Sequence, residues 1–155
     1  MKLRNIRNLP VFLGSSAKVL GRVERAVVGD DFEVLYLVVQ TQDNAKGIIF
    51  RDDFELKEES VLALREDCIK SYAHGEELSI YEKKIGDRVF DQNGRELGVV
   101  SDLIISREAK KAWGIEVSSG LIVDILDGRR EIPLDQIRWA STLSAVACQE
   151  GSDTT

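Results

Sequence analysis

Few side chains in this chain of 155 residues have the types and spacing that catalysis or metal binding requires. The single histidine, His74, has no serine, cysteine or acid at a spacing typical of a nucleophile and its base. Cys68 and Cys148 are the only cysteines, and two thiols alone cannot complete a tetrahedral zinc site. We therefore expect an exposed linker histidine, two small and partly buried cysteines, and no catalytic, metal or cofactor site.

Pairs of aspartates recur along the chain, and most of them stand beside turn residues. Aspartate in a turn accepts hydrogen bonds from nearby backbone N–H groups. The segment Asp91-Gln-Asn93-Gly94 has some likeness to a calcium-binding loop, but its glycine comes two positions early and position twelve is Asp102 instead of glutamate. Turn chemistry is therefore the prediction for the pairs Asp30-Asp31, Asp52-Asp53, Asp87 with Asp91, and Asp124 with Asp127.

Asp102 interrupts the apolar stretch Val99–Ile105. A buried carboxylate needs a partner, so two positions are open: an outward-facing place on a strand, or an ion pair with Arg129. A structural use is favoured over a ligand site in either case.

Composition and charge oppose a general nucleic-acid binder. The formal net charge is −6 and the pI is near 4.9, whereas phosphate binding needs clustered lysine and arginine. Neither of the two common glycine-rich phosphate-binding motifs is present. A local basic patch stays open if folding brings together three short groups: Lys2, Arg4 and Arg7; Lys83, Lys84 and Arg88; Arg107, Lys110 and Lys111.

The overall composition is that of an ordinary globular protein, with 43% hydrophobic and 31% charged residues. The sequence has no uncharged apolar stretch of about 18 residues, the length that a transmembrane helix needs. The first eight residues have no apolar core of the kind found in signal peptides. We therefore expect a cytoplasmic protein without a transmembrane segment.

The strongest pattern in the sequence is an internal repeat. Leu20-Gly-Arg-Val-Glu-Arg-Ala-Val-Val-Gly29 aligns with Leu97-Gly-Val-Val-Ser-Asp-Leu-Ile-Ile-Ser106 at an offset of 77 (97 − 20). Tyr36 falls on Trp113 at the same offset. We then expect the loss of one residue, so that Leu56–Val61 pairs with Ile132–Ile137 at an offset of 76 (132 − 56).

Each copy has the signals of short strands joined by turns. The clearest is a predicted hairpin, in which a type I′ turn at Asn93-Gly94 joins Arg88–Asp91 to Arg95–Leu97. Asp127-Gly128 predicts a second turn, after the apolar run Leu121–Val123.

Helix signals are weak. One or two helical turns are compatible with Glu55–Leu62, and a short 3₁₀ segment is predicted within Pro133–Ile137.

These signals predict an all-β protein made of two tandem small barrels with short helical turns. We place repeat one at residues 1–75, repeat two at 76–150 and a polar, disordered tail at 151–155, with Ser71–Glu77 as the joint. Five or six short strands per copy suffice for a small barrel, which limits the exposed edges of an open sheet.

An ordered series of motifs in repeat two resembles the PRC-barrel domain family: Leu97-Gly-x-Val-x-Asp102, the strand that begins at Trp113, and Gly128-Arg-x-x-Ile-Pro-Leu134. The resemblance covers nearly the whole chain twice and is stronger in repeat two, because repeat one has Phe54-Glu-Leu-Lys57 in place of the last motif. We therefore interpret the chain as two tandem PRC-barrels.

PRC-barrels occur in the cytoplasmic part of the H subunit of bacterial photosynthetic reaction centres, at the C-terminus of ribosome maturation factors, and as stand-alone proteins of bacteria and archaea. The resemblance implies a compact barrel used for protein contacts, with no catalytic residues to carry over. The sequence shows neither the membrane helix of the H subunit nor the extra N-terminal barrel of the maturation factor, so neither specific role is expected to transfer.

Aromatic residues are few. Tyr36 and Trp113 are expected to anchor equivalent core positions, whereas Trp139 matches Ala63 at the offset of 76 and breaks the symmetry. Such a tryptophan either caps the core or presents a contact surface, because Trp and Arg are enriched at binding hot spots. The candidate partner-binding residues are Trp139, Arg129 and Arg130.

Three functions are compatible with these observations. The favoured one is a non-enzymatic adaptor, monomer or homodimer, that binds a protein whose identity the sequence does not give. The second, by analogy with the maturation factor, is a role in ribosome or RNA metabolism through a ribosomal protein or RNA. The third is small-ligand binding in a cleft between the barrels.

Overall fold

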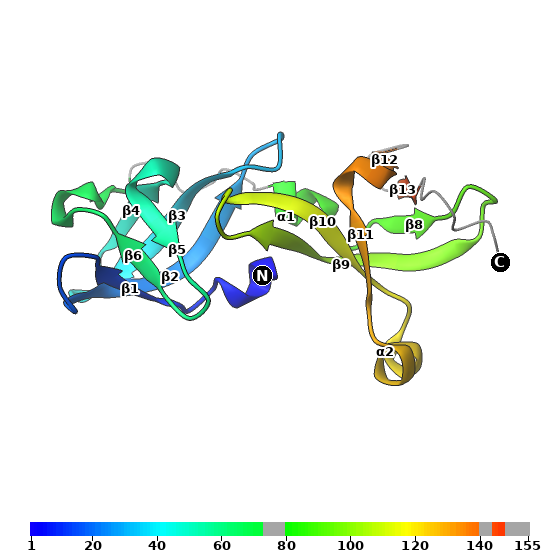
Figure 1. The fold of residues 1–155 in the computed structure, drawn as a ribbon, viewed down its shortest axis with the longest axis horizontal. Coiled ribbons are helices and arrows are strands. Elements are labelled where there is room, and N and C mark those ends of the chain that lie inside the picture. Colours follow the sequence, from blue (N-terminus) through cyan, green and yellow to red (C-terminus); the bar gives the residue numbers. More distant parts are fainter. Residues whose placement is uncertain (73–79, 140–143, 148–155) are drawn as a thin grey trace. The chain divides into compact units, whose positions relative to one another are not determined.

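The computed structural model describes residues 1–72, 80–139 and 144–147. The described residues form an all-β structure that divides into two compact units (Figure 1). The first unit comprises Met1–Tyr81 with Ile105–Ala112, and the second comprises Glu82–Ile104 with Trp113–Thr155. His74, Cys148 and the tail at 151–155, for which we made predictions above, lie outside the described residues.

The first unit is a curled sheet with the strand order β5-β6-β1-β2-β3-β4-β7. Strand β1 pairs in parallel with β6, and the other neighbours are antiparallel. Apolar side chains such as Leu37, Ile49 and Phe54 alternate into its core and are fully buried. Its strands are β1 (Pro10–Leu13), β2 (Val19–Val28), β3 (Val34–Thr41), β4 (Lys46–Phe50), β5 (Phe54–Leu56), β6 (Val61–Ala63) and β7 (Lys70–Ser71); its 3₁₀ helices are η1 (Leu3–Asn5), η2 (Arg51–Asp53) and η3 (Glu66–Cys68).

The second unit is a curled sheet with the order β11-β10-β9-β8-β13-β12, in which β8 and β13 are parallel. Its core contains Leu103, Ile115 and Ile132, all fully buried. The elements after residue 79 are α1 (Ile80–Lys84), β8 (Arg88–Phe90), β9 (Glu96–Ser106), β10 (Lys111–Ser118), α2 (Leu121–Asp127), β11 (Arg130–Pro133), η4 (Leu134–Gln136), β12 (Ile137–Trp139) and β13 (Ser144–Ala147). Neither helix in the described part of the chain has the length and hydrophobicity to cross a membrane.

The two sheets share one topology, which confirms the fold class and the internal repeat. Read in reverse, the second order, β12-β13-β8-β9-β10-β11, matches β5-β6-β1-β2-β3-β4 of the first. Gly21 and Gly98, which stand at the offset of 77, lie at the same place in each sheet. A Cβ atom would collide with the backbone oxygen of Gln40 at Gly21 and with that of Ser118 at Gly98. The Leu-Gly motif is therefore a packing requirement in both copies.

The predicted alignment of the later segments is wrong. Strands β3 and β10 match at an offset of 78, because Gln40 O approaches Gly21 as Ser118 O approaches Gly98 (118 − 40), and η2 matches η4 at an offset of 83 (134 − 51). No residue is lost, because the four-residue connection at 42–45 between β3 and β4 becomes an eleven-residue connection at 119–129 that contains α2. Trp139 is therefore equivalent to Leu56 (139 − 83) and not to Ala63.

The hairpin between β8 and β9 is confirmed, but its turn is not type I′. Gly94 has a φ of 80°, whereas Asn93 is not among the residues with positive φ. Gly94 N–H donates to Asp91 O (3.1 Å) and Asp91 N–H to Arg95 O (2.8 Å), as in a type I turn followed by a left-handed glycine. Asp91 Oδ1 accepts the N–H groups of Asn93 and Arg95 at 2.9 Å each, which is the predicted turn chemistry.

Two further expectations fail because alternating strands take precedence over local signals. Residues 54–63 form the β5–β6 hairpin instead of helical turns, closed by the bond from Lys57 N–H to Ser60 O (2.9 Å). Trp113 is 43% exposed, since buried neighbours on both sides place it on the outer face of β10, whereas Tyr36 is buried as expected. The 3₁₀ helix η4 and the burial of Cys68 are confirmed. Helix α2 was not predicted.

The tip of the β9–β10 hairpin, residues 105–112, belongs to the first unit, a feature that the division at residue 75 does not include. Val34 N–H donates to Lys110 O (2.9 Å), and Ala112 N–H donates to Phe32 O (2.8 Å). Ile105 N–H donates to Met1 O (2.6 Å). Backbone bonds between residues far apart in sequence therefore fix this tip.

Lys110 gives the tip a side-chain anchor. Its Nζ donates to the backbone oxygens of Arg51 and Phe54, each at 2.6 Å, and lies 5.0 Å from the centre of the Phe54 ring. Burial lowers the pKa of Lys110, and the nearby carboxylate of Asp52 acts in the opposite direction. The ammonium group thus satisfies two carbonyls, one in η2 and one in β5.

Replacing this anchor should destabilise the protein. We expect Lys110→Met to lower the free energy of unfolding by about 1–2 kcal/mol, because two carbonyls lose their donor. The control is Lys111→Met. The Lys111 side chain is exposed, so its replacement should change the free energy of unfolding by less than about 0.5 kcal/mol. Urea unfolding of the full chain, followed by circular dichroism, measures both. Equal losses of stability in the two variants would contradict the anchoring role of Lys110.

Candidate functional site

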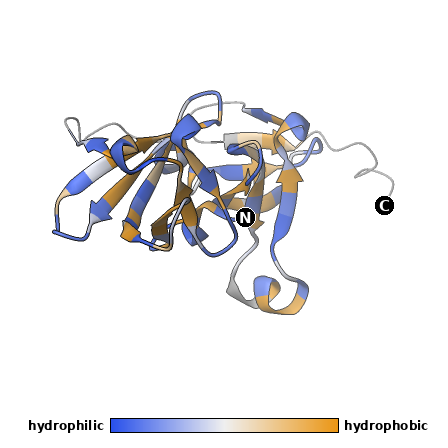
Figure 2. Cartoon of the chain, turned by 60° about the vertical axis from the view of Figure 1, so that its left-hand side comes forward, coloured by the Kyte–Doolittle hydropathy of each residue, from blue (hydrophilic) through white to orange (hydrophobic). Residues whose placement is uncertain are grey.

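Helix α2 exposes large hydrophobic side chains. Ile125 is 73% exposed and Leu126 is 76% exposed, the two highest values among the large hydrophobic residues that the structure describes, and Val123 is 43% exposed. The helix projects from the sheet of the second unit between β10 and β11 (Figures 1 and 2). Glycines with positive φ, Gly120 and Gly128, stand at its two ends and let the chain leave and re-enter the sheet.

Asp124 ties α2 to the end of β10. Its Oδ2 accepts hydrogen bonds from Ser118 Oγ (2.6 Å) and Arg129 Nε (3.2 Å), and its Oδ1 accepts the Ser119 N–H (3.0 Å). The hydrogen bond from Ser118 is the main reason why the pKa of Asp124 is lowered, with the Ser119 N–H and Arg129 adding to it. The Asp124 carboxylate is thus held in its ionised form where α2 meets the end of β10.

Arg129 connects this carboxylate to a second one inside the sheet. Its Nη1 donates to Glu116 Oε1 (2.8 Å), and Ser101 Oγ donates to the same atom (2.8 Å). Glu116 is fully buried on β10, while the Arg129 side chain is 39% exposed. Hydrogen bonding to Glu116 raises the pKa of Arg129 further. We call this set, Glu116, Arg129 and Asp124, the Arg129 bridge.

The predicted partner-binding residues take different roles. Arg129 is engaged in the bridge, and Arg130, exposed at the start of β11, follows it directly. Trp139 is half-buried on β12, with the Lys84 ammonium 4.5 Å from the centre of its ring. Arg129 and Arg130 therefore adjoin α2, whereas Trp139 lies on the strand at the other end of the sheet order. The exposed side chains of α2 itself were missed, because a short apolar run does not distinguish a buried strand from a projecting helix.

Two more carboxylates are buried in the second unit. Asp102 is fully buried, so the outward-facing alternative is wrong; its Oδ1 accepts the Leu103 N–H (2.8 Å). The ion pairs of Arg129 that we describe go to Glu116 and Asp124. Asp87 is 4% exposed, and within the described residues its Oδ2 has no hydrogen-bond partner. Burial raises the pKa of Asp87, and the charge of Lys84 partly offsets this rise.

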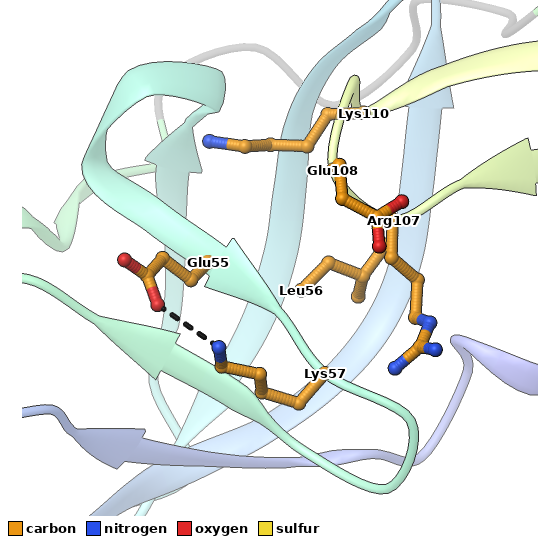
Figure 3. Close-up of a pocket in the computed structure, with 6 residues that line it drawn as sticks. All are labelled: Glu55, Leu56, Lys57, Arg107, Glu108 and Lys110. Atoms are coloured by element: carbon orange, nitrogen blue, oxygen red, sulfur yellow. Dashed lines mark ion pairs between the residues drawn. The ribbon is translucent and has the colours of Figure 1, made fainter.

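The first unit contains a polar cavity of about 440 Å³ (Figure 3). Glu55, Leu56 and Lys57 line it from the β5 segment, and Arg107, Glu108 and Lys110 line it from the β9–β10 tip. A second cavity of about 640 Å³ lies over β1, β2 and the end of β3 in the same unit. No group of three or more His, Cys, Asp or Glu side chains in the described residues could hold a metal ion.

The Arg129 bridge should be essential to the second unit. We expect Arg129→Met to lower the free energy of unfolding by about 2–3 kcal/mol, because it leaves a buried carboxylate without its counter-charge. The loss stays below that for a fully buried pair because Arg129 is partly exposed. Denaturant titration of the full chain measures it. Arg130→Met is the matched control, and the double variant Glu116→Gln/Arg129→Met should recover part of the loss. Similar losses for Arg129→Met and Arg130→Met would argue against the bridge.

The buried Asp87 should make stability fall as the pH rises. Its folded-state pKa lies above the ordinary 3.8, so the unfolded chain ionises first and this contribution is lost above about pH 4. We expect Asp87→Asn to raise the free energy of unfolding by about 1 kcal/mol at pH 7 and to have a smaller effect at pH 4. Melting temperatures from pH 4 to 8 test this, with the exposed Asp135→Asn as control. A pH-independent difference would refute the assignment.

Comparison with known proteins agrees with this geometry. The PRC-barrel domain family matches residues 77–144, a span that includes β8 to β12, α2 and the Arg129 bridge. No curated protein matches the chain. Strands β1 to β7, outside the matched span, have the same order and the same parallel pairing. The second repeat of this chain belongs to the PRC-barrel domain family, and the first repeat is a barrel-like unit of the same topology.

Proposed function

We propose that this chain is a non-enzymatic adaptor that binds a partner protein through α2. The observation that carries the proposal is the exposure of Ile125 and Leu126 on a helix that the Arg129 bridge holds in place. Exposed apolar side chains that are grouped together mark interaction sites in soluble proteins. Because the helix is already anchored, binding costs little conformational entropy.

The size of α2 favours insertion into a partner's groove. A helix of seven residues is about 10 Å long. Two such helices packed on each other bury far less than the roughly 1,200 Å² of a stable interface. A groove that surrounds the helix buries Ile125 and Leu126 on several sides. Arg130 lies exposed beside the helix, so a groove bordered by a carboxylate matches it best.

A role through RNA contact has less support. Arg88, from one basic group, makes two hydrogen bonds to Glu96, at 2.9 and 3.1 Å. Lys110, from another, donates to backbone carbonyls instead of facing outward. Internal engagement of these cations, together with the net charge of −6, favours a protein partner over a nucleic acid.

Removing the apolar side chains of α2 should abolish partner binding without unfolding the barrel. We expect Ile125→Ser/Leu126→Ser to lower partner capture at least tenfold, since central apolar anchors carry most of the energy of an interface. Quantitative affinity capture from native extract, with mass spectrometry, compares wild type and variant. The control is Leu64→Ser, which changes a 47% exposed side chain of the first unit.

The alternative surface around Trp139 is tested in parallel with Trp139→Ala. Proteins that are lost with Trp139→Ala and kept with the α2 variant would show that β12, and not α2, is the docking element. Melting curves of all variants identify losses that are due to unfolding.

A further inference from the structure

We infer that the free edge of β5 in the first unit binds an extended peptide segment that carries a carboxylate side chain. All residues of this surface belong to the first unit, so the inference is independent of α2. It rests on three observations: which backbone groups of β5 are still available, a cation beside them that has no partner among the described residues, and the arrangement of charged side chains around the cavity.

Strand β5 ends the sheet order of the first unit and has β6 on one side only. Asp53 O accepts the Leu64 N–H and Lys57 N–H donates to Ser60 O, both at 2.9 Å. In an antiparallel ladder, bonded residues alternate with residues whose N–H and C=O point to the opposite edge. Residues 53, 55 and 57 therefore bond toward β6, and the backbone groups of Phe54 and Leu56 point away from it.

The two outward-pointing residues differ in one respect. Phe54 O already accepts the ammonium of Lys110 at 2.6 Å. Leu56, which lines the cavity of about 440 Å³, has no such donor in the described part of the chain. Its N–H and C=O together form the hydrogen-bonding pair that an added strand uses. The β9–β10 tip therefore occupies the edge of β5 at Phe54 and leaves Leu56 as the residue that can pair with a peptide backbone.

Charged side chains around Leu56 define the chemistry of the peptide (Figure 3). Lys57 is paired with Glu55 at 3.2 Å. Arg107 is half-buried, and within the described residues it has no hydrogen bond or ion pair. A guanidinium in such a position is matched by a carboxylate, to which it donates two parallel hydrogen bonds.

The charge balance of the cavity selects a single carboxylate over a more highly charged group. Lys57 is paired with Glu55, and Lys110 lies close to the carboxylates of Asp52, Asp53 and Glu55. Arg107 is therefore the lining cation that has no carboxylate partner among the described residues. One glutamate or aspartate side chain neutralises the charge of Arg107, whereas a phosphate dianion would be repelled by Glu55 and Glu108. An acidic extended segment of a partner is therefore the occupant.

The test uses the full chain labelled with ¹⁵N and two blocked pentapeptides, acetyl-Thr-Val-Glu-Val-Thr-amide and its Glu-to-Gln analogue. We expect the Glu peptide to shift the amide resonances of Leu56, Lys57 and Arg107, and to bind about tenfold more tightly than the Gln peptide. Arg107→Met should remove this preference while leaving the fold intact, and Arg130→Met should keep it. The double variant Ile125→Ser/Leu126→Ser should also keep it, which separates this site from α2.

In the peptide titrations, any of three results would overturn the inference: equal affinities of the two peptides for wild type, an unchanged preference in Arg107→Met, or shifts confined to residues outside 54–57 and 105–110. A concentration-dependent shift of Leu56 without peptide, accompanied by dimers in analytical ultracentrifugation, would assign the edge to a second copy of this chain and equally refute a peptide partner.

Discussion

The parallel pairing of an early strand with a late one is the constraint on which each unit depends. Strands β1 and β6 pair in this way in the first unit, and β8 and β13 pair in the second. Parallel neighbours need a long connection, and here the strands that lie between them in the sequence supply it, in a sheet that curls. The curl brings backbones too close for any Cβ at Gly21 and Gly98. One chemical requirement, a glycine after leucine, therefore recurs in both copies.

The second repeat departs from the first where it inserts α2. An insertion that exposes isoleucine and leucine to water costs solubility, and an unanchored loop would turn these side chains inward. The Arg129 bridge prevents this, because the guanidinium donates to buried Glu116 in the sheet and to Asp124 in the helix. Burying Glu116 is costly by itself, so the bridge ties the stability of the sheet to the position of the helix.

The first unit obtains part of its structure from residues that follow it by more than 20 positions in the chain. The β9–β10 tip bonds to Met1, Phe32 and Val34, and Lys110 satisfies carbonyls of Arg51 and Phe54. The same tip partly covers the edge of β5. At the equivalent edge of the second unit, Trp139 takes the place of Leu56 and lies under Lys84. The repeats share a topology but differ at their edges, which is where copies of one fold acquire separate contacts.

The sequence by itself determined the features that local chemistry controls. β-branched runs, the glycine of the β8–β9 turn and the recurring Leu-Gly pair were sufficient to predict strands, a hairpin, a repeat and its fold. Tertiary structure alone decided which faces are buried. Trp113 points outward, residues 54–63 pair as strands, and Asp102 lies in the core, because strand register depends on partners far away in the sequence. The Arg129 bridge and the unpaired edge at Leu56 were out of reach for the same reason: each is made by residues from separate segments, and only the folded chain brings them together. The exposed helix α2 was missed because a short apolar run does not distinguish a buried strand from a projecting helix.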